Sequence, residues 1–228
     1  MNHKDKQVDT FAHSTDSPKA PAVPGMAPDT VIVLASNSPR RRELLSMIVP
    51  EFRMAGKREV DENYPSTMEA DEVPVFLSKV KAEAYAADLA PGEILLTADT
   101  VVICPDGEIL GKPSGREEAI AMLSKLSGKT HRVVTGVTLS ALRGCGESRS
   151  LRSRSFGECT RVSFAPLSEA EIETYVDTFR PFDKAGAYGI QEWIGCTAIS
   201  GIDGCFYNVM GLPLHALYSA LKDFTGND

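Results

Sequence analysis

A single aspartate, Asp99, stands inside an apolar stretch that runs from Ile94 to Cys104. The β-branched residues of this stretch predict a mostly buried strand. A charged carboxylate in such a strand is costly unless it has a partner. Asp99 is therefore either neutralised by a cation that stabilises the fold or retained for chemistry, and its position alone leaves both interpretations open.

A second candidate is the arginine-rich turn that follows the first predicted strand, Val31–Ala35. Ser38 is a good N-cap and Pro39 a good first helical residue. The arginines Arg40–Arg42 then occupy the first turn of the helix, where the helix dipole disfavours positive charge. They are either a solvated charge run or an anion site beside free backbone N–H groups, and the misplaced charge favours the anion site.

The sequence also offers Asp99 a cation. Asp106 and Gly107 form a strong two-residue hairpin signal, which pairs Val101 with Lys112 on the returning strand. Because side chains alternate along a strand, Lys112 then lies diagonally across from Asp99, at roughly 7–8 Å between backbones. A lysine side chain can span that distance, so the register predicts an ion pair that is compatible with a structural or a catalytic role.

The composition limits what the rest of the chain can do. With 228 residues, 43% of them hydrophobic, it can form one large domain or two compact lobes. Its net charge of −7 argues against a general binder of nucleic acids or membrane surfaces, which needs a broad basic face. Without a long apolar run we expect neither a transmembrane helix nor a secretory signal. Five cysteines with no CxxC pair predict a reducing, cytoplasmic location.

The elements that would position these residues alternate between strand and helix. Residues 1–28 are rich in polar residues and proline and predict a disordered tail, which leaves 29–228 as a single domain. Residues 143–157 are rich in Arg, Ser and Gly and predict a flexible hairpin loop. The predicted fold class is α/β, with a mixed central sheet flanked by helices and room for two lobes. Strands are expected at 31–35, 94–104, 131–142 and 158–165, and a strand end is expected at 206–210. Helices are expected at 71–87 and 114–126. Another helix is expected to begin at 168, and a last one to end at about 224.

Five blocks of sequence together resemble the Maf family of nucleoside triphosphate pyrophosphatases. They follow the family's order between residues 31 and 224, and they are Ser36–Leu45, Ala98–Val102, Gly111–Pro113, Asp183–Gln191 and Asn208–Pro213. The resemblance implies a fold like that of inosine triphosphate pyrophosphatases, with an elongated mixed sheet and a cleft between two lobes. It also implies hydrolysis of a nucleoside triphosphate to the monophosphate and pyrophosphate with a divalent cation, Mg²⁺ or Mn²⁺, and it suggests a homodimer.

The resemblance also assigns roles to single residues. Asp99 corresponds to the catalytic aspartate. Arg40, Thr100 and Gln191 fall on the positions that distinguish substrates, and they match the branch that prefers dTTP and UTP rather than the branch acting on methylated or other pyrimidine nucleotides. The other site residues that it implies are Arg41, Lys81 and Lys112, near the phosphates, and Glu62, which would hold the metal ion together with Asp99.

Two features keep other interpretations open. Glu192 and Trp193 stand where the family usually has a glycine-rich stretch, so the same chemistry could act on modified pyrimidine or other nucleotides. The segment 143–157 could serve a partner if the chain were a non-catalytic regulatory or interaction protein. Against this last alternative, Asp99, Lys112 and the paired arginines are all present, and a protein that had lost catalysis need not keep them.

Overall fold

The computed structural model describes residues 20–144 and 150–225. The strands of this part of the chain are β1 (Val31–Ala35), β2 (Phe52–Met54), β3 (Glu93–Ile103), β4 (Ile109–Leu110), β5 (Thr130–Arg143), β6 (Ser150–Phe164) and β7 (Ile199–Asp203). They form a mixed sheet of seven strands in the order β2-β1-β3-β5-β6-β7, with β4 paired to β3. β1 runs parallel to β2 and β3, and the other pairs are antiparallel.

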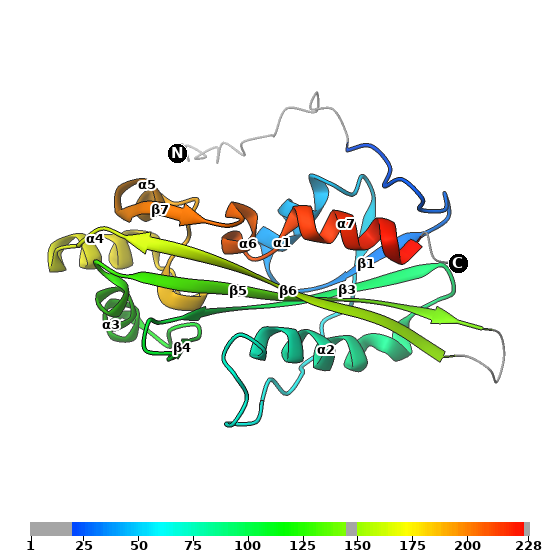
Figure 1. The fold of residues 1–228 in the computed structure, drawn as a ribbon, viewed down its shortest axis with the longest axis horizontal. Coiled ribbons are helices and arrows are strands. Elements are labelled where there is room, and N and C mark those ends of the chain that lie inside the picture. Colours follow the sequence, from blue (N-terminus) through cyan, green and yellow to red (C-terminus); the bar gives the residue numbers. More distant parts are fainter. Residues whose placement is uncertain (1–19, 145–149, 226–228) are drawn as a thin grey trace, which may run out of the picture.

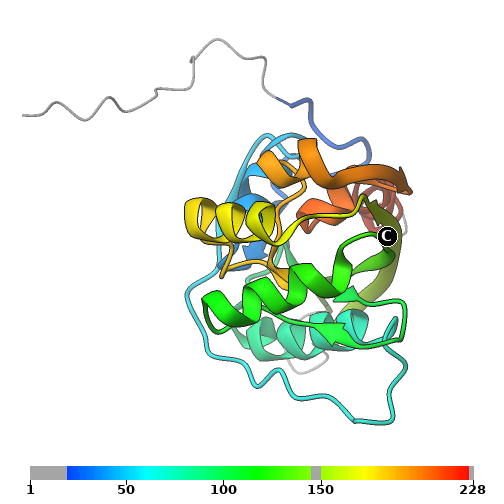
Figure 2. The same cartoon turned by 90° about the vertical axis from the view of Figure 1, so that its left-hand side faces the viewer.

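Helices cover both faces of the sheet. They are α1 (Pro39–Ser46), α2 (Val73–Tyr85), α3 (Arg116–Leu126), α4 (Glu169–Phe179), α5 (Trp193–Ala198), α6 (Phe206–Met210) and α7 (Leu214–Thr225), with short 3-10 turns at Ala86–Asp88 and Ala185–Ala187. In Figure 1, α1, α6 and α7 lie on one face and α2 on the other. Figure 2, viewed from the end that carries α3 and α4, shows α4, α3 and α2 one below another. None of the helices in the described ranges has the length and apolar character needed to cross a membrane.

β3 separates two hydrophobic cores because its side chains alternate between the faces of the sheet. Leu96 belongs to a buried cluster that includes residues of α1 and α7. Val101 belongs to a different cluster, formed with residues of α2. Asp99 shares the face of Val101 and projects toward α2, whereas Thr100 projects toward α1 and α6. Asp99 and Thr100 are neighbours in β3, but their side chains therefore lie on opposite faces of the sheet.

The edge of β3 that faces β1 is paired only in part. β1 pairs with residues 93–97, and β4 pairs with Val102 and Ile103. Within the described part of the chain, residues 98–101 have no strand beside them on this edge, although β5 pairs with all of them on the other edge. We call this interruption, at residues 98–101, the notch. It leaves the sheet open beside Asp99.

The β3–β4 hairpin differs from the prediction by one residue. Ile103 pairs with Ile109, which removes Lys112 from its expected place diagonal to the aspartate. The predicted two-residue turn would make Pro105 a ladder residue opposite Glu108. Proline has no N–H to donate to a ladder, so the loop is wider than predicted.

The two segments predicted to be irregular are more ordered than expected. The predicted tail is wrong for residues 20–28, because Val23 is buried in the cluster that includes α7; residues 1–19 lie outside the described residues. The predicted loop at 143–157 is wrong from Ser150 onward, where β6 begins and pairs with β5. Arg152 of β6 donates to the carbonyl of Phe224, so this basic strand contacts α7. The remaining part of the loop, 145–149, also lies outside the described residues.

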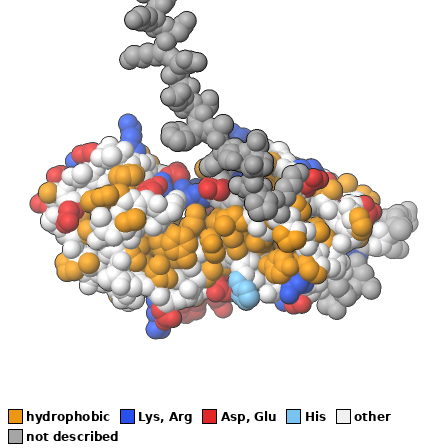
Figure 3. Space-filling model, turned by 90° about the horizontal axis from the view of Figure 1, so that it is seen from above, with side chains coloured by type: hydrophobic (Ala, Val, Ile, Leu, Met, Phe, Trp, Pro, Cys, Tyr) orange, Lys and Arg blue, Asp and Glu red, His pale blue; other side chains and the backbone are white. Residues whose placement is uncertain are grey.

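The predicted strand end at 206–210 is also wrong, because these residues form the short helix α6. The helix ends at Gly211, whose φ of 113° is in the left-handed region that favours glycine. β7 and α6 expose Ile202, Phe206 and Tyr207. Seen from above, hydrophobic side chains form a broad band across the molecule (Figure 3).

Candidate active site

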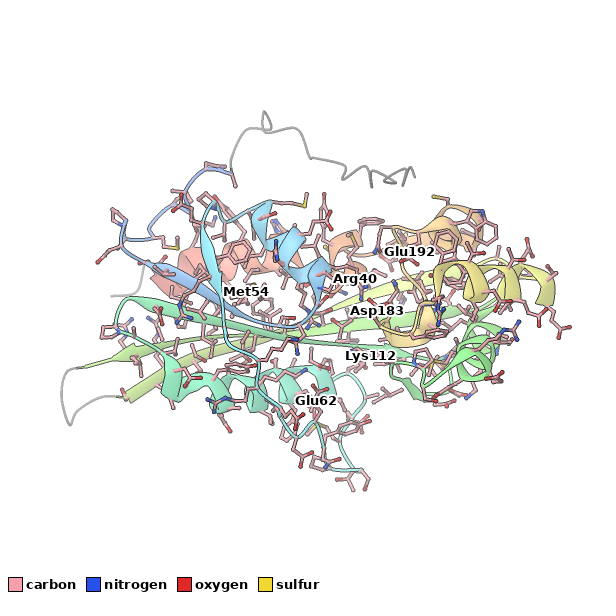
Figure 4. The ribbon with its side chains drawn as sticks, turned by 180° about the vertical axis from the view of Figure 1, so that it is seen from behind. Arg40, Met54, Glu62, Lys112, Asp183 and Glu192 are labelled. Atoms are coloured by element: carbon pink, nitrogen blue, oxygen red, sulfur yellow. The ribbon has the colours of Figure 1, made fainter. Side chains whose placement is uncertain are left out.

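A cleft of about 500 Å³ opens at the notch. The turn before α1 and the start of that helix contribute one part of its lining, and residues 183–191 contribute another. In Figure 4 the labelled side chains of Arg40, Asp183, Lys112 and Glu62 come from separate segments and gather near the middle of the molecule. Every site residue expected from the sequence lines this cleft: Arg40, Arg41, Glu62, Lys81, Asp99, Thr100, Lys112 and Gln191.

Asp99 is buried, with 8% of its surface exposed, and its partner is Lys81. The Nζ atom of Lys81 donates a hydrogen bond of 2.6 Å to Oδ1 of Asp99. The same ammonium lies 3.1 Å from Oε1 of Glu62. The predicted pair between Asp99 and Lys112 is therefore wrong, because the hairpin register places Lys112 elsewhere and helix α2 supplies the cation.

A glycine explains how α2 comes close enough to supply that cation. Gly136 of β5 is the cross-strand partner of Asp99. A Cβ atom at Gly136 would lie 2.2 Å from the carbonyl carbon and oxygen of Pro74, so the backbone of α2 rests directly on the sheet there. Lys81 follows Pro74 by about two helical turns and so lies on the same side of α2. The absence of a side chain at Gly136 thus helps to bring Lys81 to Asp99.

Arg41 is anchored by neutral acceptors. Its Nε donates to the carbonyl of Gly211 at 2.8 Å, and Nη1 donates to the carbonyl of Ala98 at 2.9 Å and to Oγ of Ser36 at 3.4 Å. Burial lowers the pKa of the Arg41 guanidinium, although nearby Asp99 opposes this shift. Arg41 thus provides a hydrogen-bond donor for the carbonyl of Ala98, which lies in the notch. It also places a fixed positive charge in the cleft.

Thr100 acts as a link in this arrangement. Its Oγ1 accepts a hydrogen bond of 2.9 Å from Nη2 of Arg41 and lies 2.9 Å from Oγ1 of Thr135. Thr135 in turn donates to the backbone carbonyl of Asn208 at 3.2 Å. The half-buried side chain of Thr100 is therefore held in place by two partners. Nothing in the sequence pattern identified Thr135 as part of the site.

Arg40 is held from the other wall of the cleft. Its Nη1 lies 2.7 Å from Oδ2 of Asp183, and Lys184 donates to Oδ1 of the same carboxylate at 2.8 Å. Partial burial raises the pKa of Asp183, but the hydrogen bonds from Lys184 and Arg40 outweigh this effect and hold the pKa below its ordinary value. The family resemblance includes the block Asp183–Gln191 but assigns a role only to Gln191, so the two charged residues at the start of the block were not expected in the site.

Lys112 lies just beyond β4 and is exposed. Among the described residues it has no ion-pair partner, whereas Lys81, Arg40 and Lys184 all contact carboxylates. An exposed lysine at the edge of a cleft is available to an incoming anion, since its ammonium is a compact, mobile positive charge.

The carboxylates of Asp99 and Glu62 fit a divalent cation. Both reach the same ammonium group, which shows that their oxygens converge on one positive charge. Mg²⁺ is typically bound by one or two carboxylates together with phosphates of the substrate. A second group, Cys104, Asp106 and Glu108, lies at the β3–β4 turn. It fits less well, because burial raises the pKa of the Cys104 thiol and Glu108 is paired with Lys125.

Comparison with known proteins places this cleft in a family. The sequence model of the Maf-like proteins matches residues 31–224, which include every residue of the site described above. The chain belongs to the Maf family. The resemblance stated from the five sequence blocks is thereby confirmed.

Curated relatives in this family carry a common name. A protein of Porphyromonas gingivalis is 50% identical over 195 residues, which cover 85% of this chain and 94% of the relative. A protein of Bacteroides thetaiotaomicron is 49% identical over 191 residues, covering 84% and 94%. One of Cytophaga hutchinsonii is 47% identical over 194 residues, covering 85% and 84%. All three are named dTTP/UTP pyrophosphatase.

Proposed function

We propose that this protein hydrolyses dTTP and UTP to the nucleoside monophosphate and pyrophosphate. The observation that carries the proposal is the buried Asp99 beside Lys81, in a cleft that also holds Arg40, Arg41 and Lys112. One carboxylate can act as a base there, while several cations can receive a triphosphate. The names of the relatives in the family support dTTP and UTP as the substrates.

In the proposed reaction a water molecule attacks the α-phosphorus. A bond forms between the water oxygen and phosphorus, the bond from phosphorus to the bridging oxygen breaks, and pyrophosphate leaves with that electron pair. Asp99 takes the proton of the attacking water as a general base. Lys112, Arg40 and Arg41 stabilise the negative charge that develops on the phosphates. Mg²⁺ or Mn²⁺, when held by Asp99 and Glu62, would supply further neutralisation of this charge.

We propose that Arg40, Thr100 and Gln191 select the base, as the family resemblance implies. The hydroxyl of Thr100 already has Arg41 and Thr135 as partners, so we expect it to influence selection through the position of Arg41. The four cysteines that the structure describes are free, which supports the cytoplasm as the site of action.

Pyrophosphate release across a panel of nucleotides, with Mg²⁺ or Mn²⁺, tests this proposal. We expect dTTP and UTP to be hydrolysed in preference to CTP, ATP, GTP and modified pyrimidine triphosphates. The variant Asp99→Asn should be folded but inactive, because its amide oxygen can still accept from Lys81 but cannot take up the proton. Preference for a modified nucleotide would redirect the substrate assignment. A folded wild-type protein that hydrolyses none of them would contradict the enzymatic proposal and favour a binding role.

A further inference from the structure

A buried lysine ties together the two ends of the segment that carries Gln191. Lys184 is 8% exposed. Its Nζ lies 2.8 Å from Oδ1 of Asp183 and 2.9 Å from Oε1 of Glu192. The segment 183–192 is thus closed on itself by one ammonium between two carboxylates, and Gln191 directly precedes the second carboxylate.

Glu192 is also attached to helix α4. Its Oε2 accepts a hydrogen bond from the hydroxyl of Tyr175, which itself accepts from the backbone N–H of Gly189 at 3.1 Å. Burial, and then the bond to Glu192, raise the pKa of Tyr175, so the hydroxyl remains a donor. A Cβ atom at Gly189 would lie 2.7 Å from the carboxyl carbon of Glu192, so the carboxylate is packed against the backbone.

The same network reaches Arg40 on the opposite wall. Asp183 receives Lys184 on one oxygen and Arg40 on the other. Figure 4 shows the labelled side chains of Arg40, Asp183 and Glu192 near one another. Two carboxylates and two cations alternate along this path, so its formal charges cancel. Glu192 and Arg40 are therefore the two ends of one chain of alternating charges.

We propose that Glu192 is a positioning residue for base selection, which sets Gln191 directly and Arg40 through Lys184 and Asp183. This inference rests on the proposed function. Without the charge of Glu192, the buried ammonium of Lys184 has Asp183 as its remaining carboxylate and competes for it with Arg40. Burial strengthens this competition, because a buried charge must be compensated. Arg40 and Gln191 would then no longer be held at fixed positions relative to each other across the cleft.

The test is the ratio of kcat/KM for dTTP to that for CTP in the full chain. In Glu192→Gln the amide still accepts from Tyr175, but the charge facing Lys184 is lost. We expect the ratio to fall about tenfold in a protein that remains folded. Glu169→Gln, an exposed change on α4, is the matched control and should leave the ratio unchanged. An unchanged ratio in Glu192→Gln, or an equal loss of kcat/KM on both nucleotides, overturns the inference.

A second variant tests the path through Lys184. Adding Lys184→Met to Glu192→Gln removes the competing ammonium, and Asp183 is left to Arg40. We expect this double variant to fold and to recover part of the ratio, since the effects of coupled residues are not additive. No recovery overturns the path through Lys184. A wild-type chain inactive on every nucleotide overturns the proposed function and this inference with it, whereas an active chain with an unchanged ratio in Glu192→Gln overturns this inference alone.

Discussion

Lys81 joins two carboxylates that come from different parts of the chain. Its Nζ atom lies 2.6 Å from Oδ1 of Asp99 in β3 and 3.1 Å from Oε1 of Glu62 in an irregular segment before α2. Asp99 and Lys81 are both largely buried, whereas the side chain of Glu62 is 57% exposed. Lys81 of α2 therefore makes the shorter contact with the buried carboxylate of Asp99 and the longer one with the exposed carboxylate of Glu62.

Substituting Lys81 tests this arrangement. In Lys81→Met the carboxylate of Asp99 stays buried and loses its cation, and the phosphates lose one positive charge. We expect pyrophosphate release to fall by about 10²-fold or more. Lys79→Met, at an exposed position of the same helix, is the control and should retain activity. Equal activity in the two variants would remove Lys81 from the mechanism.

The hydroxyl of Thr135 should matter although it does not line the cleft. Thr135→Val keeps the shape of the side chain but removes the bonds to Thr100 and to the carbonyl of Asn208. Losing such a bond typically costs about 1 kcal/mol, so we expect kcat/KM for dTTP to fall about fivefold. Thr135→Ser restores the hydroxyl and should restore the rate. If Ser is as impaired as Val, packing of the methyl group explains the effect instead.

Gly136 should tolerate no side chain. In Gly136→Ala the new Cβ would meet the backbone of Pro74, which cannot yield without moving α2. We expect the free energy of unfolding to fall by about 3 kcal/mol or more in urea titrations. Gly56→Ala is the control, because no atom lies within 4 Å of its added Cβ. A stable Gly136→Ala protein would show that α2 can move away from the sheet.

His131 should make the protein sensitive to acid. Burial lowers its pKa to about 4, below its ordinary value of 6.5, and its Nδ1 has no hydrogen-bond partner among the described residues. The unfolded chain therefore binds a proton that the folded one excludes, so stability falls as the pH drops from 6.5 toward 4.

Urea unfolding at pH 7 and pH 5 measures this effect. We expect the wild type to lose about 2 kcal/mol more between these two pH values than His131→Gln, which has no titrating group at this site. Carboxylates elsewhere contribute equally to both proteins and cancel in the comparison. The same pH dependence in the two proteins would mean that His131 is protonated without penalty in the fold.

Local signals in the sequence predicted the strand that holds Asp99 and the helix that begins at Pro39. They failed at the β3–β4 hairpin, where Asp106 and Gly107 suggested a tight turn. The tight turn would have needed a ladder hydrogen bond from Pro105, which proline cannot make. An error of one residue in register was enough to assign Lys112 to the aspartate.

The true partner could not be found from periodicity. Within the predicted helix 71–87 nothing distinguishes Lys81 from an ordinary surface charge, and only the family resemblance placed it in the site. Gly136, which is distant in the chain, allows α2 to touch the sheet and so helps to bring Lys81 to Asp99. Close approach of two elements is a property of the packed fold, and the pattern within either element does not reveal it.

The notch in β3 has a consequence for the electrostatics of the cleft. A ligand bound in the notch would lie beside residues 98–101 of β3 and exclude solvent from that side of Asp99. Attraction between charges grows as the local dielectric constant falls. A nucleotide bound at the notch would therefore lower the local dielectric constant beside Asp99 and strengthen its interaction with Lys81.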